Sequence, residues 1–208
     1  NQAEAPRGPA FSLTTVQINC ARSISTILSP AVVSIPLVVL VAFYHTSTVL
    51  SALGYAGLTL FFLSFGPLTY ILLGVRLGKL SDIDVSRRTE RTGPFLFGLL
   101  SVILGLFALA ALHAPKDLDT VMMTTAASGI IMIFITWRWK ISIHAATLAG
   151  SLTMLTALYG IVMLPMFVLL VLVSWSRVLL RRHTVAQVIM GSLVSVVLTS
   201  AVLLLRGW

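Results

Sequence analysis

The sequence predicts an all-α membrane protein, a bundle of six to seven transmembrane helices. The chain has 208 residues, of which 58% are apolar and only 10% are charged, whereas soluble domains carry about 25% charged residues. The apolar residues form runs of about 17–25, the length that crosses a hydrocarbon core about 30 Å thick. This composition excludes a soluble enzyme, a disordered chain and a disulfide scaffold, since Cys20 is the one cysteine.

A polar lead segment, residues 1–24, comes first. It contains Pro6, Gly8 and Pro9, and an interfacial helix is expected near 12–24. No signal peptide is expected, because a polar segment rather than a short basic one precedes the first apolar run. Residues 25–208 are expected to form a single transmembrane domain, because no later segment is long and polar enough to fold in water.

Seven apolar runs follow in order. The second is long enough for a tilted helix, and Gly66–Pro67 should kink it. The fifth is rich in Ala, Gly and Thr, which suits close packing between helices. Six spans are expected instead if the first or the fifth is only partly inserted. The predicted spans are 27–44, 50–77, 94–113, 120–136, 143–159, 163–180 and 185–205.

Positive charge is concentrated at one end of this bundle. Alternating spans place twelve basic residues on one face, here called the basic end, and only Lys116 and Arg206 on the other. The positive-inside rule then predicts a cytoplasmic basic end and N-terminus, in the plasma (inner) membrane. A phosphate-binding site would also concentrate arginine there. The basic end comprises Arg7, Arg22, Arg76, Lys79, Arg87, Arg88, Arg91, Arg138, Lys140, Arg177, Arg181 and Arg182.

Three polar clusters, at 79–94, 137–144 and 176–187, all belong to the basic end. The planar fork of arginine donates two hydrogen bonds to adjacent phosphate oxygens. Histidine can act as a nucleophile or a general acid near neutral pH. Arginines and two histidines that meet across a small bundle therefore indicate phosphoryl transfer.

The third cluster carries the clearest motif. Ser176-Arg177, five residues and then His183 resemble the third signature of the type 2 phosphatidic acid phosphatase family. The family signature ends in an Asp four residues after its His, and Gln187 stands at that position.

The other two clusters resemble the remaining signatures in the same order. Ser142 and His144 match the Ser and His of Pro-Ser-Gly-His, with isoleucine in place of the Pro and the Gly. Arg91 matches the Arg of a Lys, six residues, Arg-Pro signature, with Asp84 in place of the Lys. Lys79 lies five residues too early for that role.

The resemblance implies a divergent, metal-independent lipid phosphatase that acts on an isoprenoid or glycerolipid phosphate. It implies no metal and no other cofactor. The expected partners are membrane lipids and the lipid phosphate substrate, with no nucleic acid. His183 would form a phosphohistidine, His144 would protonate the leaving oxygen, and Ser142 would add a donor. The expected catalytic residues are His183, His144 and Arg177, and the expected substrate-binding residues are Arg91, Ser142, Arg88, Lys79, Lys140 and Gln187.

The altered motifs favour a second interpretation, a catalytically inactive family member. Such a protein would bind a lipid phosphate, or serve as an accessory subunit of a larger membrane complex or as a homo-oligomer. Gln187 cannot supply the charge of the family's Asp, and Asp84 would repel a phosphate unless Arg87 or Arg88 pairs with it. The sequence leaves open whether the chain is an enzyme.

Two further interpretations concern other residues. Asp82 and Asp84 also resemble the aspartate-rich loop of aromatic prenyltransferases, which holds diphosphate through Mg²⁺, but that fold needs about nine spans and a second such loop. Histidines in membrane proteins also bind pigments and haems. His45 and His113, at the end opposite the basic end, are expected to be solvated.

Overall fold

The computed structural model describes residues 14–208 and contains helices joined by short loops, with no strand in that range. Residues 1–13, which include Pro6, Arg7, Gly8 and Pro9 of the lead segment, lie outside the described part. The all-α prediction is confirmed for the rest. The elements are α1 (Thr15–Ile27), α2 (Pro30–His45), α3 (Val49–Leu60), η1 (Phe61–Phe65), α4 (Gly66–Arg76), η2 (Arg88–Glu90), α5 (Thr92–Ala111), α6 (Lys116–Arg138), α7 (Ile143–Tyr159), η3 (Gly160–Phe167), α8 (Val168–Leu179) and α9 (Val185–Leu205).

Several of these helices are long and apolar enough to cross a membrane, as an integral membrane protein requires. Five segments qualify on their own, and a sixth arises if α1 and α2, which meet at 43°, count as one broken span. The five are Val49–Arg76, Arg88–Ala111, Lys116–Arg138, Ile143–Leu179 and Val185–Leu205.

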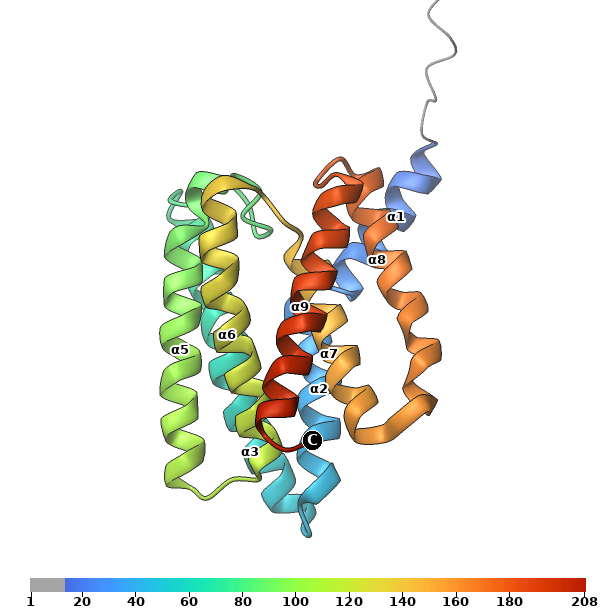
Figure 1. Cartoon of the computed structure of the whole chain (residues 1–208). Helices are drawn as coiled ribbons and strands as arrows, with labels where there is room; N and C mark the ends of the chain where they lie inside the picture. Colours follow the sequence, from blue (N-terminus) through green and yellow to red (C-terminus); the bar gives the residue numbers. More distant parts are fainter. Residues whose placement is uncertain (1–13) are drawn as a thin grey trace, which may run out of the picture.

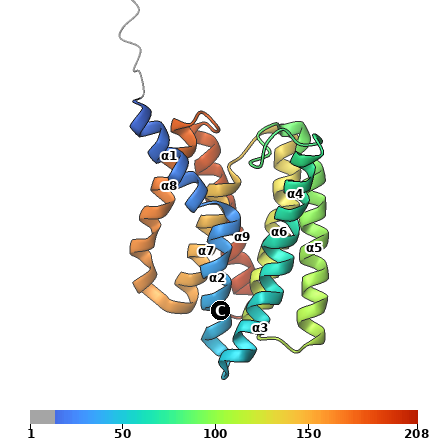
Figure 2. The same ribbon diagram turned by 180° about the vertical axis from the view of Figure 1, so that it is seen from behind.

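The predicted spans 143–159 and 163–180 belong to one apolar helical segment of 37 residues. Figures 1 and 2 show that this segment reverses direction at η3, so that α7 and α8 run antiparallel. The reversal begins at Gly160, whose φ of +73° suits a residue without a Cβ. Pro165 then lies within the 3₁₀ turn that completes it.

The helix expected near residues 12–24 is present as α1, which spans Thr15–Ile27. Thr14 caps α1 through a reciprocal capping box with Gln17, which satisfies two backbone N–H groups at the helix start. The predicted boundary at residue 24 falls inside this helix. α1 packs along α8, as Figure 2 shows, and thereby brings Ser25 to the basic end.

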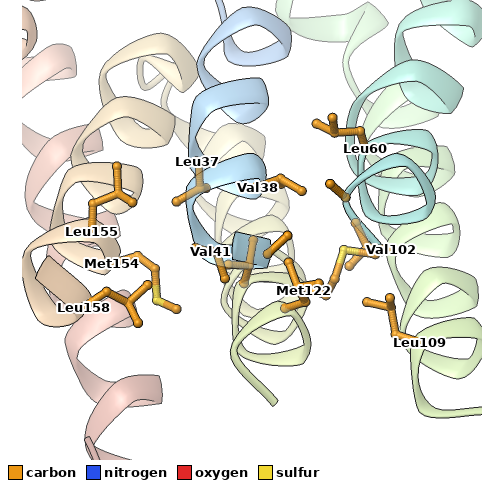
Figure 3. Close-up of a cluster of buried hydrophobic side chains, with 14 of the residues drawn as sticks. Leu37, Val38, Val41, Leu60, Val102, Leu109, Met122, Met154, Leu155 and Leu158 are labelled. Atoms are coloured by element: carbon orange, nitrogen blue, oxygen red, sulfur yellow. The ribbon is translucent and has the colours of Figure 1, made fainter. Parts of the chain in front are cut away.

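The main hydrophobic core surrounds α2. Val38 and Val41 are fully buried, and their side chains meet residues of α3, α5, α6 and α7. Figure 3 shows Leu37, Val38 and Val41 between Met154 on one side and Leu60 and Val102 on the other. α2 therefore joins the α7 side of the bundle to the α3–α6 side.

The segment that begins at Val49 changes helix type in its middle. Regular α-helix gives way to the π-helical turn η1 immediately before Gly66 and Pro67, where the sequence predicts a kink. Proline has no N–H to continue the hydrogen-bond ladder. Ser101 Oγ of α5 donates to the Phe62 carbonyl at 2.6 Å, which stabilises this interrupted turn.

α7 begins inside the bundle rather than at its surface. Figure 1 shows the chain after α6 descending between helices before α7 starts. Ser142, fully buried, donates its backbone N–H to the Gln187 carbonyl of α9 at 3.2 Å. Gly191 permits this approach, because a Cβ there would lie 2.7 Å from the Ser142 carbonyl oxygen.

We expect Gly191→Ala to lower the thermal midpoint of the detergent-solubilised protein, because the added methyl group would push α9 from the backbone at Ser142. Overpacking of this kind costs about 1–3 kcal/mol. Gly57→Ala is the matched control, since a Cβ at Gly57 of α3 meets nothing within 4 Å and alanine favours the helix by up to about 1 kcal/mol. Equal midpoints for the two variants would contradict the close approach of α7 and α9.

Candidate functional site

The predicted site residues of the three motifs converge at the basic end. Arg91 precedes α5, His144 is in the first turn of α7, Arg177 is in the last turn of α8, and His183 lies in the loop before α9. All four side chains line one cavity. Asp84 also lines this cavity.

Arg177 is the most enclosed cation of this group, with 2% of its surface exposed. Its Nη1 donates to Ser25 Oγ of α1 and to Asp84 Oδ2, each at 2.8 Å. Its Nε is buried and has no partner among the described residues.

Asp84 pairs with Arg177 rather than with its neighbours Arg87 and Arg88 in the sequence. Burial raises the pKa of Asp84, but the charge and hydrogen bond of Arg177, with the charges of His144 and Arg182, outweigh burial and hold the pKa below its usual value of 3.8. The carboxylate is therefore ionised at neutral pH and occupies part of the anion-binding surface of Arg177.

Arg91 holds the neighbouring loops in place. Its exposed fraction is 3%, its Nε donates to the Val85 carbonyl at 2.9 Å, and its Nη1 reaches the Ile141 carbonyl at 3.4 Å. Val85 has a φ of +46°, which is rare for a β-branched residue. The contact with Arg91 helps to maintain that conformation directly after Asp84.

His183 is oriented by Gln187, as the motif spacing predicts. The ring is 6% exposed, and the Nδ1–H donates to Gln187 Oε1 at 3.1 Å, so that Nε2 keeps its lone pair. Burial, together with the charges of Arg177, Lys140 and Arg91, lowers the pKa of His183 to about 3, although Gln187 raises it slightly. His183 is therefore neutral at physiological pH.

His144 belongs to the second motif, which precedes the motif of Arg177 in the chain. It is 7% exposed, and its buried Nε2 has no partner within residues 14–208. Ser142 differs from its predicted role, because its hydroxyl caps α7 by accepting the Ala145 N–H at 3.4 Å and it does not line the cavity. The start of α7 nevertheless directs its positive dipole end toward the site.

The other predicted phosphate ligands lie around the cavity rather than in it. Lys140 Nζ donates to the Arg182 carbonyl at 3.1 Å, and burial with the charges of Arg91, Arg177 and Arg182 lowers its pKa. Arg88 Nη1 bonds the carbonyls that end α6, those of Trp137 and Arg138. Lys79 is exposed, and its ammonium group makes no hydrogen bond or ion pair in the described chain.

Two contacts at the site have no signal in the sequence. Ser25 reaches Arg177 from 152 positions away, and Arg182 donates to Ser86 across 96 positions. Only the packing of α1 on α8 and of loop 77–91 over the basic end creates them. The remaining acids pair locally, since Glu90 bonds Arg87 at 3.4 Å and Asp82 accepts from Ser86.

The opposite end of the bundle contains a second polar group. His45 Nδ1 contacts the carboxylate of Asp117, which is buried at the start of α6. More than half of the His45 side chain is exposed, in keeping with the expected solvated position. His45 ends α2 and Asp117 is in the first turn of α6, and Figure 1 shows that these helix ends lie at the end of the bundle opposite the start of α9.

Within residues 14–208, no three His, Cys, Asp or Glu side chains are grouped so that they could hold a metal ion. The cations at the site are Arg91 and Arg177, with Lys140 beside them. Together these features define a helical membrane protein with a buried cationic site that contains two histidines. No protein-family model, curated protein or solved structure matches the chain.

We expect the His183 ring to stay neutral at pH 5, since its pKa of about 3 lies well below the usual 6.5. Neutral His183 then contributes stability above pH 6.5, and this contribution is lost as the pH falls from 6.5 toward 3. NMR of histidine-labelled protein should show no titration of His183 between pH 7.5 and 5. Lys140→Gln should raise its pKa by removing a neighbouring charge. Protonation of His183 near pH 6.5 in the unmodified chain would contradict the buried, cationic environment.

Proposed function

We propose that the protein is a divergent, metal-independent lipid phosphatase that acts on an isoprenoid or glycerolipid phosphate. The observation that carries the proposal is the shared cavity, in which two buried histidines lie beside two buried arginines. Both Arg91 and Arg177 are cations that a phosphoryl group would neutralise. The helices around the site are apolar enough to lie in a bilayer, and a lipid would reach the site from that bilayer.

The proposed reaction uses the Nε2 atoms of His183 and His144, which have no hydrogen-bond partner among the described residues. His183 Nε2 attacks phosphorus while the bond from phosphorus to the ester oxygen breaks, and His144 in its protonated form gives a proton to the departing alkoxide. Water then attacks the phosphohistidine, His144 takes a proton from that water, and inorganic phosphate leaves. The arginines stabilise the charge on the phosphoryl oxygens, which is how positive charge commonly accelerates phosphoryl transfer.

Gln187 limits the rate in this scheme. Its Oε1 accepts the Nδ1–H of His183 and so fixes the tautomer, but a neutral amide does not stabilise the imidazolium that develops as the phosphorus–nitrogen bond forms. Loss of a carboxylate from a comparable histidine–aspartate pair costs on the order of 10⁴ in rate. The proposal therefore requires a slow enzyme.

A second candidate function is supported by Asp84. Its carboxylate already occupies Arg177, as expected of a relic that serves as a lipid-phosphate binder or as an accessory subunit of a membrane complex. The two candidates share the same anion site and differ in whether His183 forms a covalent intermediate.

The proposal includes a location in the plasma (inner) membrane with the basic end in the cytoplasm. Eleven of the thirteen basic residues in the described part belong to that end, and cytoplasmic loops carry an excess of Lys and Arg. The site then opens toward the cytoplasmic leaflet.

Gln187→Asp should raise phosphate release from a lipid phosphate at least tenfold, because the new carboxylate stabilises the imidazolium of His183. The measurement uses purified protein in detergent or nanodiscs without added metal. Radiolabelled phosphate should become covalently attached to the acid-quenched chain.

His183→Ala is the blank for this assay, and Arg76→Ala, at an exposed position of the basic end, is the matched surface control. Gln187→Asp combined with Asp84→Lys tests whether Asp84 also suppresses turnover. Release no greater than that of His183→Ala in all of the other chains would refute the enzyme and leave the binding role.

A labelling experiment tests the orientation. In a Cys20→Ser background, Thr89→Cys at the basic end should react with a membrane-impermeant maleimide only from the cytoplasmic side, whereas Ser47→Cys should react only from the other side. Both positions are exposed in loops or short turns. The reverse pattern would overturn the orientation.

A further inference from the structure

The site cavity continues from the basic end into the middle of the bundle. Its volume is about 390 Å³, within the range of pockets that enclose small ligands. Along α6 its lining extends from Met132 to Val121, and along α7 from His144 to Met154. At 1.5 Å per residue, each of these stretches is about 15–16 Å long. The cavity is therefore long and narrow, with the arginines and histidines at one end.

The lining of the deep part is compatible with hydrocarbon. Val102, Leu37 and Met154 contribute apolar surface there. Three of the hydroxyl groups in the lining, those of Ser34, Ser64 and Thr125, bond carbonyls, whereas those of Thr124 and Thr199 are buried and have no hydrogen-bond partner among the described residues. Deep in the cavity, beyond His144, the described residues place no charged group.

The cavity has room for one chain. A methylene group and a water molecule are similar in size, and a water molecule takes about 30 Å³ in the liquid, so 390 Å³ corresponds to roughly a dozen carbons. The two acyl tails of an ordinary glycerophospholipid together contain more than twice that number of carbons. A single chain of that length in single file would match both the volume and the narrow shape.

Two glycines leave the deep part open. Gly98 of α5 and Gly129 of α6 both line the cavity, and a Cβ built on either would meet no atom within 4 Å. Neither glycine is required for close helix contact, because small residues at a packed interface would show near neighbours, as Gly150 does with Ser195 at 2.6 Å. Their effect is to widen the cavity.

We infer that this cavity binds a single hydrocarbon chain of a lipid monophosphate, with the phosphate at Arg177 and the chain between α5, α6 and α7. The inference rests on the proposed function for the position of the phosphate. It selects single-chain phosphates, such as prenyl or alkyl phosphates, over phosphates with two acyl chains. Gly98 and Gly129 are the residues that set the length of chain that fits.

Binding of alkylphosphonates to the full chain in nanodiscs tests the inference, because their carbon–phosphorus bond resists hydrolysis. Affinity should rise about fourfold for each added methylene, up to roughly a dozen carbons, and then level off. Gly129→Leu and Gly98→Leu should move that plateau to shorter chains and weaken dodecylphosphonate binding at least tenfold. Butylphosphonate should bind all variants equally.

Gly57→Leu is the matched control, because a side chain there also enters open space but does not line the cavity. Its dodecylphosphonate affinity and chain-length plateau should match the unmodified chain. A plateau that is unchanged in both cavity variants, or moved equally in Gly57→Leu, would overturn the inference.

Phosphate release in the same nanodiscs separates the two proposals. Dodecyl phosphate should be hydrolysed faster than dioleoyl phosphatidate, and Gly129→Leu should remove the difference. Hydrolysis of both lipids at equal rates would overturn the chain site but support the phosphatase. Chain-length-dependent binding without any hydrolysis would support the chain site and refute the phosphatase.

Discussion

The structure of the basic end depends on a buried guanidinium group that must be paired. Arg177 is almost fully enclosed, and an unpaired charge in such a position costs several kcal/mol. Its hydrogen bonds to Ser25 and Asp84 join three parts of the chain, namely α1, α8 and loop 77–91. The same pairing brings Asp84 into the cavity, so the group that stabilises the end of the bundle also limits the free charge of the site.

The late start of α7 is the second feature on which the site depends. Irregular backbone at membrane depth persists only where protein groups or a cavity satisfy its polar atoms. Here Ser142 and Gln187 bond through their backbones, and Gly191 allows the approach. As a result, the N-terminus of α7 and His144 lie inside the bundle beside Arg177, rather than at the surface.

Much of the fold follows from local sequence, whereas much of the site does not. Hydropathy predicts the span 185–205 to the residue and the span 50–77 to within one residue at each end, because apolar length is a local property. It also predicts the break between the spans 143–159 and 163–180, where the chain reverses from Gly160 onward. Motif spacing predicts the meeting of Arg91, His144, Arg177 and His183. It cannot reveal that Asp84 reaches Arg177, because that pair depends on the path of a loop between distant helices.

The charge balance at the cavity links the fold to the two candidate functions. A phosphate and a carboxylate compete for one guanidinium group, since like charges at such short range raise each other's energy. The site has further cations close enough to affect its groups, namely Arg91, Lys140 and Arg182. The Asp84 carboxylate offsets one positive charge, so the site keeps a net positive charge. Under the proposed function, a phosphate that reached Arg177 would meet one repulsive neighbour, Asp84, and several cations. Asp84 would then weaken phosphate binding without abolishing it, and burial of a hydrocarbon chain in the cavity would add to the affinity for a lipid phosphate.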